Sequence, residues 1–402
     1  MSEWRKVKLG EITESCLGKM LDATKNRGEF QPYLANINVR WGAFNLKNLS
    51  QMKFEPYESE RYGIRYGDLI ICEGGEPGRC AIWKEQIPNM KIQKALHRVR
   101  PIEDKVNNFY LFYWFLLAGK RNAIDQYCTG ATIKHLPAQK LKEMVIDLPS
   151  LSTQNRIATI LSRYDSLIDN YQKQIKLLEE AAQRLYKEWF VNLRFPGHEN
   201  TKIVDGVPEG WEKKSLNQVI NLQSGFAFKS SSFDDKGKYK LVTIKNVKDG
   251  SFDGDNVNRL AEVPEKMPIH CRLNDGDILL SLTGNVGRVC LVNGENYLLN
   301  QRVAKLKSKY QAFTYCLFRS HDMFVEVNNL ANGAAQQNVS PIRIGQMQIV
   351  VPNEHIINAF EFKASKFVST ILKCHSQLRL LTESRDRLLP KLLSGEIEVL
   401  KV

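Results

Sequence analysis

The sequence consists of two similar halves, and this duplication limits the possible fold more than any other feature. Trp4 and Leu9 recur as Trp211 and Leu216, and the run 67–71 recurs as 276–280. Further matches follow in the same order, shifted by 203 to 209 residues: Gly75, Gly78, Arg79, Leu141, Met144, Ile146 and Pro149 match Gly284, Gly287, Arg288, Ile344, Met347, Ile349 and Pro352. Chance similarity does not preserve order along most of a chain. The sequence therefore predicts a tandem repeat of one structural unit.

Each copy begins with roughly 150 residues of short apolar runs, aromatic residues and glycine turns. The runs 69–71 and 278–280 predict buried strands that enter glycine-rich loops, and 109–117 predicts a buried helix or strand. These patterns are typical of a mixed α/β domain. Because a long helix follows in each copy, the expected fold class is α+β: two mixed α/β domains in tandem repeat, separated by two long antiparallel coiled-coil helices.

The helices are predicted by apolar residues spaced alternately four and three apart, which is the heptad seam of a coiled coil. The first seam is Ile157, Leu161, Tyr164, Ile168, Tyr171, Ile175, Leu178, Ala182, Leu185 and Trp189. The equivalent positions 203 residues later are Phe360, Ala364, Phe367, Ile371, Cys374, Leu378, Leu381, Arg385, Leu388 and Leu392. Arg385 is the exception to the apolar pattern, and Pro390 is expected to kink the last turn.

Two matching stripes fit against each other, and a closed arrangement of the two copies makes them antiparallel. The alternative is that each stripe packs on its own globular domain, as most amphipathic helices do. The expected segments are residues 1–150 (first domain), 151–195 (first helix), 196–210 (linker), 211–352 (second domain) and 353–402 (second helix). A two-helix rod of roughly 48 Å would hold the domains apart, and four residues added after Glu180 would lengthen it.

The chain is basic, which favours a polyanionic partner. Its net charge is +13 with a pI near 9.2, and the halves on either side of Gly206 carry +7 and +6. Such an excess suits nucleic acid, because cations placed on phosphates release counterions; the alternative is a basic protein without such a partner. No apolar stretch is long enough to span a membrane, and the eight scattered cysteines suggest reduced thiols, so a cytoplasmic protein is expected.

Motifs of nucleotide binding and catalysis are missing from the sequence. There is no phosphate-binding or dinucleotide-binding glycine motif, no Pro-Pro pair of the kind that amino-methyltransferases use, and no nucleophile elbow. Glu212 and Lys214 resemble part of a nuclease site but lack a clear upstream aspartate. We therefore expect a non-catalytic chain that binds no metal and no cofactor.

Candidate DNA contacts are polar residues in loops, where Arg and Lys can donate to guanine and Asn and Gln can read adenine. The candidates are Lys19, Lys25, Arg27, Arg40, Arg79, Gln93, Lys94, Lys134, His135, Lys229, Lys245, Arg288, Gln301, Arg302, Gln336, Gln337 and Asn338. The paired glycines before Arg79 and Arg288 suggest a loop against DNA phosphate, or simply a tight turn that ends in a solvated arginine. The halves diverge at these loops, as two different readouts would require.

The segments 177–190, 195–197, 208–211 and 385–397 resemble the specificity subunit of type I restriction–modification systems, and the resemblance extends over the whole chain. It implies two target-recognition domains, each reading one half of an asymmetric split site in double-stranded DNA. It also implies two methyltransferase subunits that bind S-adenosylmethionine, and two motor-nuclease subunits that use ATP and magnesium. Tyr186, Phe190 and Phe195 are expected to form partner-docking surface, unless they are buried against the chain's own domains.

Two other functions remain open at this point. A DNA-binding structural adaptor without restriction–modification partners would share the basic charge and the rod. A self-contained methyltransferase or nuclease would need the cofactor and catalytic motifs that the sequence lacks.

Overall fold

A computed structural model describes residues 4–22, 26–255, 257–331 and 337–399. The chain forms two compact units: unit 1 comprises Met1–Leu167 with Leu381–Val402, and unit 2 comprises Ile168–Leu380. Each unit thus includes part of both long helices, whereas the expected segmentation gave the helices segments of their own. Among the described residues, no helix combines the length and the apolarity needed to cross a bilayer.

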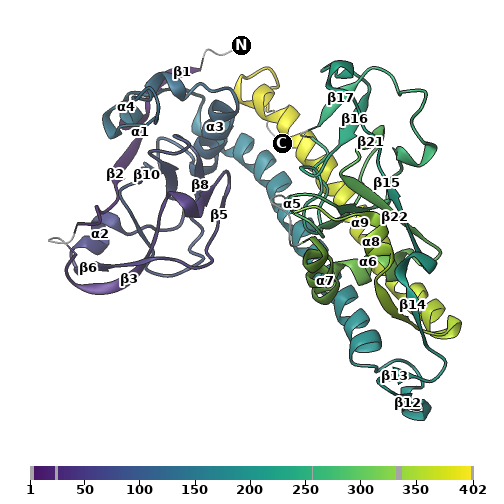
Figure 1. The fold of residues 1–402 in the computed structure, drawn as a ribbon. Helices are drawn as coiled ribbons and strands as arrows, with labels where there is room; N and C mark the ends of the chain where they lie inside the picture. The colour runs from purple at the N-terminus through teal and green to yellow at the C-terminus, as the bar shows by residue number, and fades with distance from the viewer. Residues whose placement is uncertain (1–3, 23–25, 256, 332–336, 400–402) are drawn as a thin grey trace. The chain divides into compact units, whose positions relative to one another are not determined.

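Unit 1 is built on a four-stranded antiparallel sheet in the order β2-β10-β7-β8. Figure 1 labels β2, β10 and β8 of this sheet. A smaller sheet, β6-β3-β9, lies in the same unit, and β1 pairs with β11. Its strands are β1 (Arg5–Lys8), β2 (Thr13–Leu17), β3 (Glu29–Leu34), β4 (Val39–Arg40), β5 (Ala43–Phe44), β6 (Gln51–Phe54), β7 (Leu69–Cys72), β8 (Cys80–Ile82), β9 (Lys91–Ile92), β10 (Leu96–Pro101) and β11 (Val145–Leu148). Its helices are α1 (Leu9–Ile12), α2 (Glu58–Tyr62), α3 (Asn108–Lys120), α4 (Ala138–Glu143) and the first part of α5 (Leu151–Tyr186).

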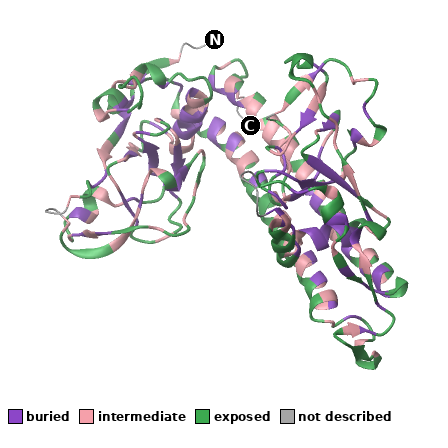
Figure 2. Ribbon diagram, viewed as in Figure 1, coloured by how far each residue is buried: buried purple, intermediate pink, exposed green. Residues whose placement is uncertain are grey.

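The central strand β7 is buried on both faces, which explains its continuous apolar run. Leu69 and Ile71 join a core formed with α3 and the long helices, whereas Ile70 and Cys72 join a second core beneath the smaller sheet. Successive residues of a strand point to opposite faces, so a strand covered on both sides needs apolar residues throughout. Figure 2 shows this burial at the centre of the unit. The buried strand and the buried helix α3 confirm the sequence-based expectation.

Unit 2 repeats this plan with the sheet order β15-β22-β19-β20 and the pair β14-β23. Its central strand alternates in the same way: Ile278 and Leu280 face one core, and Leu279 faces the other. Its strands are β12 (Ile203–Val204), β13 (Val207–Pro208), β14 (Glu212–Ser215), β15 (Ile220–Ser224), β16 (Tyr239–Val242), β17 (Asn258–Leu260), β18 (Arg272–Leu273), β19 (Ile278–Ser281), β20 (Val289–Leu291), β21 (Tyr297–Leu299), β22 (Val303–Ser308) and β23 (Gln348–Val351). Its helices are α6 (Gln311–Arg319), α7 (His321–Ala331), α8 (Pro341–Gly345) and most of α9 (Glu354–Leu393). The predicted duplication and the mixed α/β class are confirmed.

In unit 1, the start of α5 and the end of α9 pack together against the sheet core. Ile157 and Leu161 share this core with Leu389 and Leu392. The seam exception Arg385 has a partner here, because its guanidinium bonds to Asp165 at 2.7 Å and the Tyr113 hydroxyl donates to the same carboxylate at 2.5 Å. A polar residue in an apolar seam is therefore satisfied by a tyrosine–carboxylate–arginine cluster that joins α3, α5 and α9.

Unit 2 contains an equivalent cluster. The Tyr315 hydroxyl of α6 donates to Glu179 of α5, and Arg319 bonds to the same carboxylate at 3.3 Å. Burial raises the pKa of the Tyr315 hydroxyl, which keeps it protonated as the donor. Each unit thus forms hydrogen bonds to one carboxylate of α5, which is Asp165 in unit 1 and Glu179 in unit 2.

The two long helices run antiparallel within unit 2. Cys374 of α9 contacts Gln174 of α5, while Phe360 contacts Trp189, with ring centroids 5.7 Å apart. Later residues of α5 therefore meet earlier residues of α9. The described seam residues combine both expected kinds of contact, because they face the partner helix and also contribute to the cores of the domains. All of them are buried or half-buried.

The expectation that Tyr186, Phe190 and Phe195 form a docking surface is wrong. Tyr186 and Phe195 are buried, and Phe190 is half-buried with its ring 4.8 Å from that of Phe360. After α5 the chain makes a π-helical turn, Lys187–Val191, and these aromatic rings then pack into the core of unit 2 beside Trp211. Burial raises the pKa of the Tyr186 hydroxyl. The alternative of burial against the chain's own domain is the correct one.

Candidate nucleic-acid interface

The antiparallel order of the central sheet brings four chain segments to one end of each unit. In unit 1, β2 and β7 end where β10 and β8 begin, because neighbouring strands run in opposite directions. The same holds for β15, β19, β22 and β20 in unit 2. Loops meet at this end, and loops carried on a rigid scaffold are where binding residues are commonly found.

In unit 1, backbone hydrogen bonds tie these loops together. Glu73 donates to Ala95 at 2.9 Å, Leu136 donates to Glu73 at 2.7 Å, and Gly74 forms a β-bridge with His135. Asn36 adds a fourth segment, because its side-chain amide donates to the Gly74 carbonyl at 2.6 Å. We call residues 36–38, 72–79, 93–95 and 129–136 the first loop end.

Unit 2 builds the same arrangement from the equivalent segments. Leu282 donates to the carbonyl of Arg302 at 3.0 Å, Val339 donates to Leu282 at 2.9 Å, and Thr283 forms a β-bridge with Asn338. We call residues 243–246, 281–288, 300–302 and 337–339 the second loop end. Since His135 and Asn338 occupy matching bridges, the pairing of these loops inferred from the sequence corresponds to a pairing in space.

The repeated glycines have a structural reason that does not depend on a ligand. Gly78 and Gly287 have φ of 87° and 84°, in the left-handed region that side chains rarely adopt. A Cβ on Gly78 would lie 2.3 Å from Ile124, and one on Gly287 would lie 2.9 Å from Asn328. These glycines make the tight turn that returns the chain to the sheet.

The arginine after each turn has a different environment in the two units. Arg79 is largely buried; it bonds to Glu76 at 2.9 Å and to the side chain of Asn36 at 2.8 Å. In unit 2 the loop carries Asn285 in place of a glutamate and Ile244 stands opposite, so neither partner exists. Among the described residues, no hydrogen bond or ion pair holds the Arg288 guanidinium. Arg79 therefore holds its own loop, whereas the described part of the chain gives the Arg288 guanidinium no such partner.

The second loop end presents cations that no carboxylate of the described residues neutralises. Lys245 and Arg302 are exposed, Arg288 is half-exposed, and no carboxylate of the described chain pairs with any of them. The amides of Gln337 and Asn338 are exposed beside them, and Asn338 accepts a hydrogen bond from Thr283 at 2.8 Å. Unpaired cations interleaved with amides are what phosphate contact and base reading require.

The structure gathers most, but not all, of the candidate residues. Those at or beside the loop ends are Arg40, Arg79, Gln93, Lys94, Lys134, His135, Lys245, Arg288, Gln301, Arg302, Gln337 and Asn338. Arg27 and Lys229 are exposed in the loops after β2 and β15. Lys25 and Gln336 lie outside the described residues.

Lys19 is not a DNA contact in this structure. Its ammonium is buried and bonds to Glu58 at 2.5 Å and to the Lys53 carbonyl at 2.9 Å. A cation paired with a carboxylate inside the domain cannot reach a phosphate. Lys134 is also ion-paired, with Asp125 at 2.6 Å, but both side chains are about half exposed, so it stays accessible.

Sequence reasoning missed the residues that tie the central strand of each sheet to its neighbour, at the end of the sheet away from the loop ends. The repeated Gly-Asp step is one example: Asp68 accepts two hydrogen bonds from Arg100 at 2.8 Å, and Asp277 pairs with Lys305 at 2.7 Å. Both carboxylates lock the start of the central strand to its neighbour. The recurrence of the aspartate in both halves indicated a structural role. Its partner lies on another strand, however, and cannot be identified from the local sequence.

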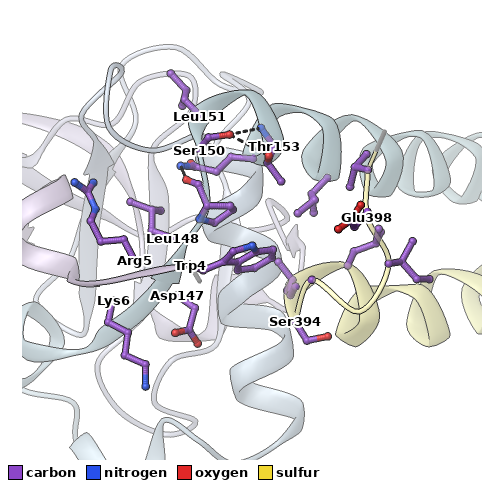
Figure 3. A pocket seen from close by; sticks show the side chains of 18 of the residues that line it. Trp4, Arg5, Lys6, Asp147, Leu148, Ser150, Leu151, Thr153, Ser394 and Glu398 are labelled. Atoms are coloured by element: carbon purple, nitrogen blue, oxygen red, sulfur yellow. Dashed lines mark hydrogen bonds between the residues drawn. The ribbon is translucent and has the colours of Figure 1, made fainter. Parts of the chain in front are cut away.

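A pocket of about 970 Å³ opens elsewhere in unit 1 (Figure 3). It is lined by β1, β11, the start of α5 and the segment after α9, and it includes Trp4, Asp147 and Glu398. The Trp4 ring packs close to Gly395, and Arg156 bonds to the Val399 carbonyl at 3.0 Å. Its lining has no histidine or cysteine, and no group of three metal-ligating side chains occurs among the described residues. The pocket is lined in part by residues from both ends of the described chain. None of the described candidate DNA residues lines it.

The cysteines have no features of a nucleophilic site. All eight are free, and burial raises the pKa of the Cys80, Cys290 and Cys316 thiols, which disfavours the reactive thiolate.

Comparison with known proteins identifies the family. The family described as "Type I restriction modification DNA specificity domain" matches residues 1–180 and 208–368. The chain is 29% identical over 347 residues to the type I restriction enzyme MjaIX specificity subunit of Methanocaldococcus jannaschii, covering 83% of this chain and 78% of the relative. It is 25% identical over 413 residues to the MjaVIII specificity subunit of the same organism, covering 99% and 93%.

A solved structure has the same fold. The type I restriction–modification S subunit from M. genitalium aligns with a TM-score of 0.62 at 16% identity, covering 99% of this chain and 97% of that one. The two segments that match the family fall on the two repeats and together span most of the sequence. The chain therefore belongs to the family of type I restriction–modification DNA specificity subunits.

Proposed function

We propose that this chain reads a bipartite, asymmetric site in double-stranded DNA for a type I restriction–modification complex, with one half-site for each loop end. The observation that carries the proposal is that one loop scaffold is built twice with different side chains. The matching bridges at His135 and Asn338 support a common docking geometry. The contrast between Arg79, which is paired, and Arg288, for which the described residues provide no partner, supports different readouts. A shared scaffold with divergent loops suits a site whose halves differ in sequence.

The two long helices are proposed to set the length of the unread gap between the half-sites and to dock two methyltransferase subunits. In each unit a tyrosine donates a hydrogen bond to a different carboxylate of α5, which supports a fixed position of the helix against each domain. Exposed apolar residues on the helices, such as Leu177 and Phe362, are suited to a partner surface. The aromatic residues around Tyr186 are buried and do not take this role.

Catalysis is assigned to the partners. Two methyltransferase subunits would bind S-adenosylmethionine, and two motor-nuclease subunits would use ATP and magnesium. This chain would contribute recognition and no reaction of its own, in line with its family and with the missing sequence motifs. The candidate residues are cationic and amide side chains, which are of the kinds that contact phosphates and bases.

Reconstitution tests this proposal. We expect the purified chain alone to transfer no methyl group to DNA, and the chain combined with its methyltransferase partner to methylate one bipartite sequence. Radiolabelled methyl transfer to duplex DNA measures both. Methylation by the isolated chain would identify a self-contained enzyme instead. Salt-dependent DNA binding together with failure to direct any methyltransferase would identify a DNA-binding adaptor.

Arg288 and Arg79 form a matched pair for a second prediction. Arg288→Gln is expected to weaken binding to all sequences alike and to lower the slope of log affinity against log salt by about one, because one phosphate contact is lost. Arg79→Gln is expected to leave the slope unchanged and to destabilise unit 1 by about 1–3 kcal/mol, because Glu76 and Asn36 lose their partner. Salt titrations of DNA binding and urea unfolding measure the two effects. Equal salt slopes for the two variants would contradict the assignment.

A further inference from the structure

The first loop end carries two large aliphatic side chains that do not contribute to a core. Ile37 is 71% exposed and Ile133 is 65% exposed. An isoleucine exposed to this extent buries little apolar surface on folding, so both side chains are accessible to a ligand at this loop end. Neither residue stands out in the sequence, because polar residues were the natural candidates for DNA contact.

Both isoleucines sit on loops that are held in place. The turn around Ile37 is fixed by the Ala35 amide, which donates to Asn38 at 2.8 Å, and by the Asn36 amide, which donates to Gly74 at 2.6 Å. The loop of Ile133 is closed by two backbone hydrogen bonds between Thr129 and His135, each 2.8 Å. Because Gly74 also bridges to His135, one residue anchors both loops. Because both loops are already fixed, the two isoleucines lose little conformational entropy when they bind a ligand.

The charged residues around Ile37 and Ile133 indicate the kind of ligand that these side chains contact. Arg40 and Lys94 are exposed nearby, and no carboxylate of the described chain pairs with either. Apolar side chains beside accessible cations suit a DNA groove, and the exposed Glu76 carboxylate of the same loop end is held by Arg79. The second loop end differs here, since the position equivalent to Ile37 is Lys245.

Given the proposed function, we infer that Ile37 and Ile133 read thymine in the first half-site by contacting its C5-methyl group. In the major groove, the thymine methyl is the apolar group among donors and acceptors, and aliphatic side chains recognise it by contact. Asn and Gln are suited to adenine, and Arg to guanine, so an aliphatic pair adds a distinct readout. The first half-site therefore contains at least one thymine that is recognised through its methyl group.

Deoxyuridine tests this directly, because it pairs as thymine does but lacks the methyl group. The full chain with its methyltransferase partner would be measured on duplexes of its mapped site, with each thymine of both halves replaced in turn. Burying one methyl is worth about 0.8 kcal/mol, so we expect about a fourfold loss of affinity at a recognised thymine. The loss should occur in one half of the site only.

Variants then assign the effect to the isoleucines. The double variant Ile37→Ala with Ile133→Ala should lose affinity for thymine DNA and lose no more when the recognised thymine becomes deoxyuridine. Ile269→Ala, at a residue of unit 2 that is 81% exposed, is the matched control and should keep the full fourfold sensitivity. A variant that merely damages the domain would keep this sensitivity as well.

The results that overturn the inference differ from those that overturn the proposed function. If specific binding is present but no deoxyuridine weakens it, or if the first half-site has no thymine, the isoleucines do not read a methyl group. If the effects of the isoleucine substitutions and of the deoxyuridine replacements simply add, the isoleucines do not read the methyl group in that case either. Absence of any bipartite specific binding would overturn the proposed function, and this inference with it.

Discussion

Lengthening both long helices by four residues at the junction of the two units is expected to widen the unread gap by about one to two base pairs. The insertions follow Leu167 in α5 and Leu380 in α9, where unit 1 and unit 2 divide. Four residues add about 6 Å and rotate the far end about 40° beyond one turn. That rotation is close to the twist of one base pair, since DNA has about 10–10.5 base pairs per turn. Both half-sites should be unchanged, and affinity for the original site should fall roughly 10³-fold, toward non-specific binding.

The placement of the insertion matters and differs from the one that the sequence suggested. An insertion after Glu180 separates Glu179, which bonds to Tyr315, from Ala182, which lies in the core of the same unit. Such an insertion would disrupt the packing of unit 2, and it would not test whether the helices set the distance between the half-sites. This variant is therefore the control, and we expect it to unfold unit 2. Selection of bound sequences from a random pool measures the gap, and a change in the bases read without a change in the gap would contradict the spacer role.

Phe360→Ala is expected to destabilise unit 2 by about 3–5 kcal/mol, as for other buried phenylalanines. Phe360 is fully buried, and its ring contacts those of Tyr186, Trp189, Phe190 and Phe313. This one side chain joins α9 to the end of α5 and to α6, so its loss opens a cavity where three elements meet. Urea unfolding followed by tryptophan fluorescence measures the effect, because Trp189 and Trp211 lie in the same core.

The neighbouring Phe362 provides the control on the same helix. It is 67% exposed, and the Lys366 ammonium lies 4.2 Å from its ring centroid. Phe362→Ala should change the stability by no more than about 0.5 kcal/mol. Similar unfolding midpoints for the two variants would show that the aromatic cluster does not hold unit 2 together.

The architecture was predictable from the sequence because its signals are local or repeated. The apolar run at β7 and the heptad spacing in α5 each reflect a periodicity that burial imposes. Duplication strengthened both, since each pattern occurred twice. By contrast, Tyr186 lies on an amphipathic helix whose faces can be assigned only when the packing domain is known, so its burial was not predictable.

The candidate interface was predictable only in outline. The glycine turns and the divergent loops located the two loop ends, because turn residues mark where strands finish. The state of each arginine was predictable only in part: Arg79 pairs with Glu76, three residues before it, but it also bonds to Asn36, which lies 43 residues away. Lys19 was misassigned for the same reason: its partner Glu58 comes from a distant segment. Contacts between remote segments therefore help to decide which charges remain available, and local sequence does not contain them.

The most direct test of the central claim is to map methylated bases in cells that contain the partner subunits and one of two forms of this chain. One form is the wild type, and the other carries Arg302→Ala, Gln337→Ala and Asn338→Ala at the second loop end. The mapped site of the variant should be changed or relaxed in one half only, with the other half and the gap identical to those of the wild type. Changes in both halves, or an identical site, would contradict the proposal that each repeat reads its own half.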